Sequence, residues 1–129
     1  MSDINRIDLK NVISLEFDKE IIDKISSDNV FMDFITEVEI SLNNLTKKYN
    51  KIFSGRLSFQ EDFENKDLRK IILTINIENL NIEEKLNFWD KLEDHLRSFL
   101  EDYYNSLDDY SKDKFIEFNE RFYTDVILN

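Results

Sequence analysis

Apolar and polar residues alternate in two segments near the middle of the chain. One side of the first segment carries Phe53, Gly55, Leu57, Phe59 and Phe63. One side of the second carries Ile71, Leu73, Ile75 and Ile77, and its other side carries Lys70, Ile72, Thr74, Asn76 and Glu78. A period of two residues is that of a β-strand whose faces differ in polarity. With the short polar stretch ENKD between them, the two segments predict a β-hairpin with one apolar face.

Longer segments have apolar residues at intervals of three and four, the period of an amphipathic helix. The clearest of them follows Ser27 and Asp28, either of which can cap a helix, and contains Phe31, Phe34, Ile35, Val38, Leu42, Leu45 and Tyr49. A shorter helix is expected after Asp18, with Ile21, Ile22 and Ile25 on one side. Asn81 and Glu84 form a capping-box pattern before a third helix. The spacing of Phe115, Phe118 and Phe122 predicts a last helix near 111–124.

A period-two pattern that ends at Leu15 and Phe17 favours one more strand, over about 12–17. The predicted order is therefore β-α-α-β-β-α-α. Because the hairpin is apolar on one face only, we expect a two-layer α+β domain. Its small, mainly antiparallel sheet consists of the N-terminal strand and the central hairpin, and long amphipathic helices cover one face. No linker or repeat divides the chain, so residues 1–129 are expected to form a single domain.

The C-terminal stretch RFYTDVILN ends on three adjacent apolar residues, Val126, Ile127 and Leu128. Three adjacent residues cannot share one stripe of a helix, so part of this tail needs cover. Packing on its own domain is the favoured alternative. A final strand formed by this tail would approximate a ferredoxin-like order, and it is the less favoured form of that packing. Burial against a second chain, a homodimer or another protein, is the other alternative and makes these residues a candidate interface.

The residue types that are rare or absent exclude several kinds of chemistry. The chain has no cysteine, one glycine and one histidine. It therefore lacks disulfides, thiolate chemistry, glycine-rich phosphate loops and multi-histidine metal sites, and we expect no cofactor and no bound metal. The N-terminus does not resemble a signal peptide, and no apolar run approaches the ~20 residues of a membrane span. A cytoplasmic location is the expectation.

The stretch NFWDKLEDHLRSFL contains the only tryptophan, Trp89, and the only histidine, His95. On a helix, Trp89 shares one stripe with Leu92, Leu96, Phe99, Leu100 and Tyr103, so it is expected to be a core residue. The neighbours of His95 at three and four residues include no carboxylate. His95 is therefore expected to be a packing residue at the edge of this stripe, without a catalytic or metal-binding role.

Charge is unevenly distributed along the chain, whose net charge is −11. Residues 1–46 carry 10 acids and 4 bases, and residues 71–129 carry 14 acids and 6 bases. Residues 47–70 carry 4 acids and 7 bases, namely Lys47, Lys48, Lys51, Arg56, Lys66, Arg69 and Lys70. If these bases gather at one end of the sheet, they are a candidate contact for phosphate or for a partner.

Adjacent acids such as Glu83 with Glu84 and Asp108 with Asp109 diverge on a helix and follow no calcium-loop pattern, so solvated surface is the simpler interpretation. No catalysis is expected, and an enzyme that uses carboxylates or a lone serine–histidine pair is the least favoured alternative. The sequence favours a small acidic protein that acts by binding a protein partner, as a regulatory, inhibitor-like or antitoxin-like module. The alternative is a nucleic-acid-related protein. It would contact phosphate through the basic hairpin, or mimic nucleic acid with its acidic faces.

Overall fold

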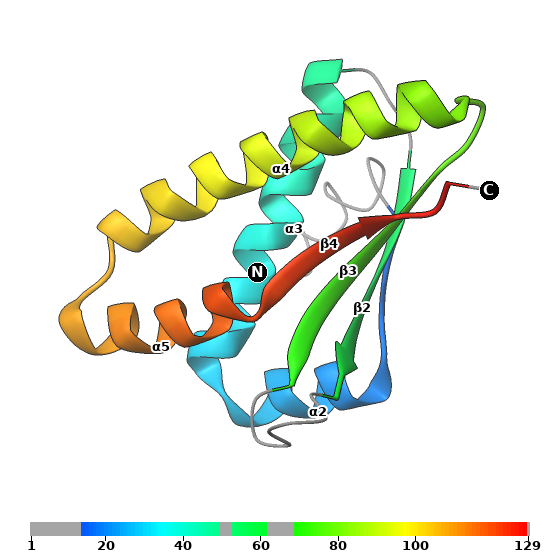
Figure 1. The fold of residues 1–129 in the computed structure, drawn as a ribbon. Coiled ribbons are helices and arrows are strands. Elements are labelled where there is room, and N and C mark those ends of the chain that lie inside the picture. The colour runs from blue at the N-terminus through cyan, green and yellow to red at the C-terminus, as the bar shows by residue number, and fades with distance from the viewer. Residues whose placement is uncertain (1–13, 50–52, 62–68, 129) are drawn as a thin grey trace.

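The computed structural model describes residues 14–49, 53–61 and 69–128, which form an α+β domain (Figure 1). Its elements are β1 (Ser14–Phe17), α2 (Lys19–Ser27), α3 (Asn29–Tyr49), β2 (Phe53–Gln60), β3 (Lys70–Ile77), α4 (Ile82–Asn105), α5 (Asp109–Glu120) and β4 (Phe122–Val126). The expected α+β class is confirmed, and a final strand extends the order to β-α-α-β-β-α-α-β. The expected turn at 64–67 and Phe63 lie outside the described residues.

The sheet has four strands in the order β1-β2-β3-β4. β2 and β3 form the expected antiparallel pair, but β1 pairs with β2 and β3 pairs with β4 in parallel. The prediction of a mainly antiparallel sheet is therefore wrong. In each half of the chain, two helices carry the backbone from the end of one strand back to its beginning, so the next strand runs in the same direction. Two β-α-α-β units thus meet at the central hairpin.

Buried and exposed side chains alternate along the strands, so one face of the sheet is covered by helices and the other is not. The covered face includes Leu57, Leu73 and Ile75, which are fully buried, and Figure 1 shows α3, α4 and α5 against it. Gly55 also belongs to this face, where an added Cβ would lie 3.0 Å from Leu15 Cδ1. Within the described residues, no helix lies over the opposite face, on which Arg56 pairs in register with Thr74.

The last helix is shorter than predicted, and the chain continues as a strand. α5 ends at Glu120, and the N–H of Arg121 bonds to the Phe118 carbonyl. The prediction that 121–124 are helical is therefore wrong. The phenylalanine spacing was misleading because Phe122 contributes to the same core from β4. β4 pairs with β3 and forms the edge of the sheet, which places Val126 in the core and leaves Ile127 exposed.

The buried stripe of α4 also differs from the predicted one. Its buried apolar residues are Phe88, Leu92, Leu96 and Leu100. Trp89 is only half-buried, at the margin of the core, where its Nε1–H donates to Thr124 Oγ1 at 2.9 Å. The prediction that Trp89 anchors the core is therefore wrong, and Phe88 occupies that position. The hydroxyl of Thr124 on β4 provides the polar partner that holds the indole at the margin.

The caps that the sequence predicts are largely present. The Asp28 carboxylate accepts the N–H of Phe31 at the start of α3, and Asn81 and Glu84 form a complete capping box before α4. Asp18 precedes α2 as expected, but its carboxylate accepts from Arg56 Nε at 2.6 Å instead of capping the helix. None of the helices in the described ranges is both long and apolar enough to cross a bilayer.

Candidate functional site

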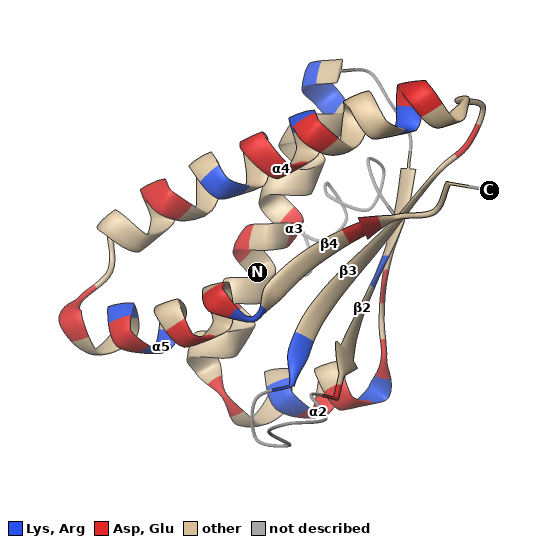
Figure 2. Ribbon diagram, in the orientation of Figure 1, with Lys and Arg blue, Asp and Glu red and all other residues tan. Residues whose placement is uncertain are grey.

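The structure places the described basic residues of segment 47–70 at separate points. Lys47 and Lys48 lie at the end of α3, which leads to the end of the sheet where Phe53 pairs with Ile77. Arg69 and Lys70 lie at the opposite end, where Gln60 pairs with Lys70. Eight residues of strand separate these ends, a distance of roughly 25 Å. Figure 2 shows basic residues at both ends.

Arg56 lies between the two groups, on the uncovered face of the sheet, where it forms an ion pair with Asp18. Lys51 and Lys66 lie outside the described residues. The described members of the set are thus distributed over two ends and one face. Their role as phosphate or partner contacts stays a prediction, and it now applies to two small groups instead of one patch.

His95 lies where α4 packs against α3. Its ring stacks on Phe99 with 6.3 Å between ring centres, and its Nε2 is buried without a hydrogen-bond partner. Burial lowers the pKa of His95, a hydrogen bond to the Ser41 backbone opposes this shift, and the charge of Lys48 lowers the pKa further. This environment therefore favours the neutral form of the imidazole.

The chemistry available near His95 is limited. Ser41 Oγ is buried nearby without a hydrogen-bond partner, but Ser41 is 0% exposed, so no substrate reaches its hydroxyl. Across the described ranges, no three His, Asp or Glu side chains gather in a way that could hold a metal ion. These observations favour neither nucleophilic nor metal-assisted chemistry in this part of the chain.

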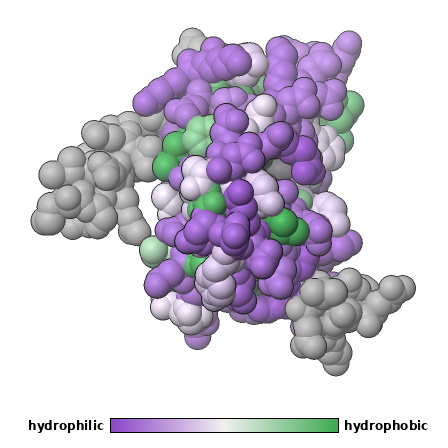
Figure 3. All heavy atoms as spheres, turned by 90° about the vertical axis from the view of Figure 1, so that its left-hand side faces the viewer, coloured by the Kyte–Doolittle hydropathy of each residue, from purple (hydrophilic) through white to green (hydrophobic). Residues whose placement is uncertain are grey.

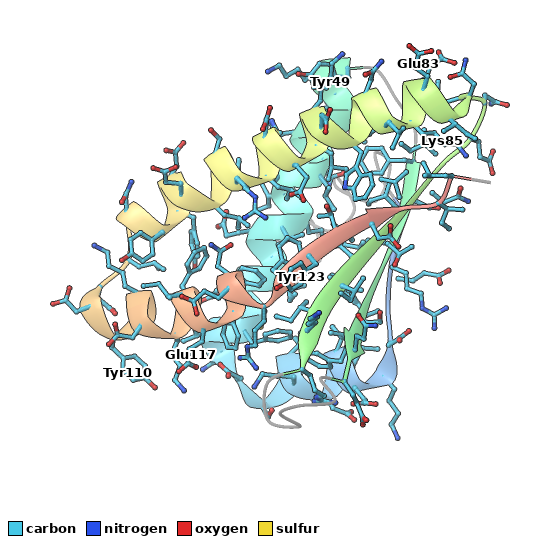
Figure 4. All side chains as sticks on the ribbon, in the orientation of Figure 1. Tyr49, Glu83, Lys85, Tyr110, Glu117 and Tyr123 are labelled. Atoms are coloured by element: carbon cyan, nitrogen blue, oxygen red, sulfur yellow. The ribbon has the colours of Figure 1, made fainter. Side chains whose placement is uncertain are left out.

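The most distinctive surface is the outer side of the second helix pair, which we call the acidic face. Residues 82–120, spanning α4 and α5, carry 12 acids and 5 bases, a net charge of −7. All of these acids except Glu93 are exposed, whereas Lys85 is buried and Lys112 and Lys114 are half-buried. Figure 2 shows the acids along both helices, and Figure 4 shows Glu83 and Glu117 pointing away from the body of the molecule.

Few of these carboxylates are neutralised by the protein itself. In the described part of the chain, Glu93 alone among the twelve forms an ion pair, with Arg97. Two further acids, Asp33 and Glu37, lie on α3. There burial raises the pKa of Glu37 and the nearby Asp33 raises it further, and after burial the same two acids raise the pKa of Tyr103. Uncompensated acids of this kind create a negative potential that attracts a cationic ligand.

A groove of about 340 Å³ runs between α4 and α5 within the acidic face. It is lined by Arg97, Glu101 and Tyr104 from α4, and by Phe115, Ile116 and Asn119 from α5. The ring of Phe115 packs against Tyr104 at 5.8 Å and forms part of an apolar floor. No local pattern in the sequence indicates this groove, because it depends on how two separate helices lie against each other.

Acids surround the groove at helical spacing. Asp94 lies three residues before Arg97, and Asp113 and Glu120 lie three before and four after Ile116. Figure 3 shows this side of the molecule as mostly hydrophilic, with apolar residues in small separate spots. The groove therefore combines a limited apolar contact with a large excess of negative charge.

Comparison of the chain with protein-family models, with curated proteins and with solved structures gives no match. Functional conclusions therefore depend on the residues and geometry described above.

Proposed function

We propose that this protein is a non-catalytic interaction module that binds a basic protein partner through the acidic face. The observation that carries the proposal is the excess of exposed carboxylates on α4 and α5, of which only Glu93 is ion-paired among the described residues. Exposed acids repel one another and lower the stability of the folded chain, so a cationic partner that relieves this repulsion gains binding free energy.

The groove between α4 and α5 is the proposed centre of this binding surface. Charged residues at the edge of an interface mainly raise the association rate, whereas a central pocket that excludes water contributes most of the affinity. A lysine or arginine side chain of the partner fits this environment. Its aliphatic stem would contact Phe115 and Ile116, and its charged end would reach Glu101.

Two variants with the same change in net charge test the proposal. The first neutralises four acids of the acidic face with Asp94→Asn, Glu101→Gln, Asp113→Asn and Glu120→Gln. The control neutralises four exposed acids elsewhere with Glu16→Gln, Asp23→Asn, Glu61→Gln and Glu78→Gln. Tagged wild-type and variant proteins are used to capture partners from the native cells, and the bound proteins are quantified at low and moderate salt.

We expect a basic protein that binds the wild type and the control, and whose binding weakens with added salt. Binding to the acidic-face variant should be at least tenfold weaker. Equal weakening in both variants would mean that only net charge matters, and retention by the acidic-face variant would mean that another surface binds. Either result contradicts the proposal.

A further inference from the structure

A second hollow, of about 100 Å³, lies at the end of the sheet where β3 begins. Three cations line it: Lys24 from α2, Arg69 just before β3, and Arg121 between α5 and β4. These residues are far apart in the sequence, and the two β-α-α-β units bring them together. We call this group the cationic hollow. Its charge is opposite to that of the acidic face, because it concentrates positive charge on a chain whose net charge is −11.

Aromatic rings form the floor of the cationic hollow. Phe31 lies between Phe59 and Phe118, with ring centres 5.9 and 5.1 Å apart. The Arg69 guanidinium stacks 4.2 Å from the centre of the Phe59 ring, and Lys24 Nζ lies 5.6 Å from the centre of the Phe118 ring. These cation–π contacts hold the cations in place before a ligand binds, which reduces the entropy lost on binding.

The cations of the hollow are only partly neutralised. Arg69 pairs with Glu20 and Lys24 pairs with Asp28, the latter at 3.4 Å. Arg121 donates its Nε–H to the Glu117 backbone carbonyl at 3.1 Å, and within the described ranges it pairs with no carboxylate. The Arg121 backbone is fixed as well, because its carbonyl accepts the N–H of Ile71. The hollow therefore holds one excess positive charge on a guanidinium whose position is restrained.

We propose that the cationic hollow binds an oxyanion of the phosphate class, independently of the protein partner proposed for the acidic face. Two guanidinium groups and one ammonium group approach from three separate segments of the chain, which suits the several oxygens of a dianion better than a planar carboxylate. The aromatic floor excludes water below the cations and strengthens their attraction for the anion. The volume of the hollow limits the bound part to a single small anionic group.

Titration calorimetry with inorganic phosphate tests this site on the full chain. The test variant is Lys24→Gln with Arg121→Gln, and the control is Lys91→Gln with Lys114→Gln, which removes one base each from α4 and α5 and leaves the groove and the cationic hollow intact. We expect wild type and control to bind phosphate equally, and the test variant to bind at least tenfold more weakly. Acetate at the same ionic strength should bind more weakly than phosphate. O-phosphoserine shows whether a phosphate carried on a side chain binds as well as the free ion.

Equal phosphate binding by the test variant would overturn the proposal, as would acetate binding as tightly as phosphate. Phosphate also stabilises proteins generally as an excluded salt, so an increase in melting temperature counts only when the test variant lacks it. If the double variant does not fold, Arg121→Lys provides a second test. It keeps the charge but loses the planar fork, and an unchanged phosphate affinity for this variant would contradict a guanidinium contact.

Discussion

At the residue scale, Phe88 and Trp89 divide the packing of α4 between the core and its margin. Phe88 is 5% exposed and packs edge-to-face on Phe53, whereas Trp89 is half-buried and bonded to Thr124. We expect Phe88→Ala to lower the free energy of unfolding by about 3–5 kcal/mol, because it leaves a cavity in the core. Trp89→Ala should cost less. Urea denaturation followed by circular dichroism measures both, and a larger loss for Trp89→Ala would contradict the described helix face.

His95 gives a prediction for pH at the same scale. Burial favours its neutral form, so its folded pKa lies below the ordinary value, and the unfolded chain takes up the proton first, near pH 6.5. The contribution of His95 to stability is therefore fully present above roughly pH 6.5 and is lost as the pH drops from there through the folded pKa. His95→Gln should remove this part of the decline. Unfolding midpoints of wild type and variant at pH 8 and pH 5.5 test it, and an identical decline in both would contradict the assignment.

At the scale of elements, β4 closes the second β-α-α-β unit, and burial alternates between its last residue and the one that follows it. Val126 is 4% exposed and Ile127 is 38% exposed. We expect Val126→Ser to lower the free energy of unfolding by roughly 2 kcal/mol, since it moves an apolar side chain out of the core. Ile127→Ser should change it by less than about 0.5 kcal/mol. Thermal melting of both variants is the measurement. Equal effects would show that the tail does not pair with β3 as described.

The same elements show what local pattern does and does not determine. The hairpin, the amphipathic face of α3 and the cap of α4 follow from periodicity and capping, because each depends on residues close in the sequence. The parallel pairings of β1 and β4 depend on where helix pairs return the chain, and no local signal contains that information. Phe122 is the clearest case, because its spacing from Phe118 fits a helix while its contacts are those of a strand.

At the scale of the whole molecule, charge is sorted into regions that the linear sequence only partly predicts. The acidity of residues 71–129 is visible in the sequence, and the acidic face follows from it once α4 and α5 pair. The cationic hollow is not visible, because Lys24, Arg69 and Arg121 belong to three segments far apart in the sequence and meet only in the fold. The described basic residues of 47–70 show the reverse. They belong to one short segment of the sequence, but the fold separates them to opposite ends of β3.

Zero-length cross-linking of the protein to its captured partner tests the acidic face most directly. A carbodiimide joins a carboxylate to a lysine amine only when the two are in contact, and mass spectrometry then identifies the acid used. We predict cross-links from the partner's lysines to Asp94, Glu101, Asp113 or Glu120, around the groove. Cross-links confined to Glu16 or Asp125, on the uncovered face of the sheet, would contradict the account.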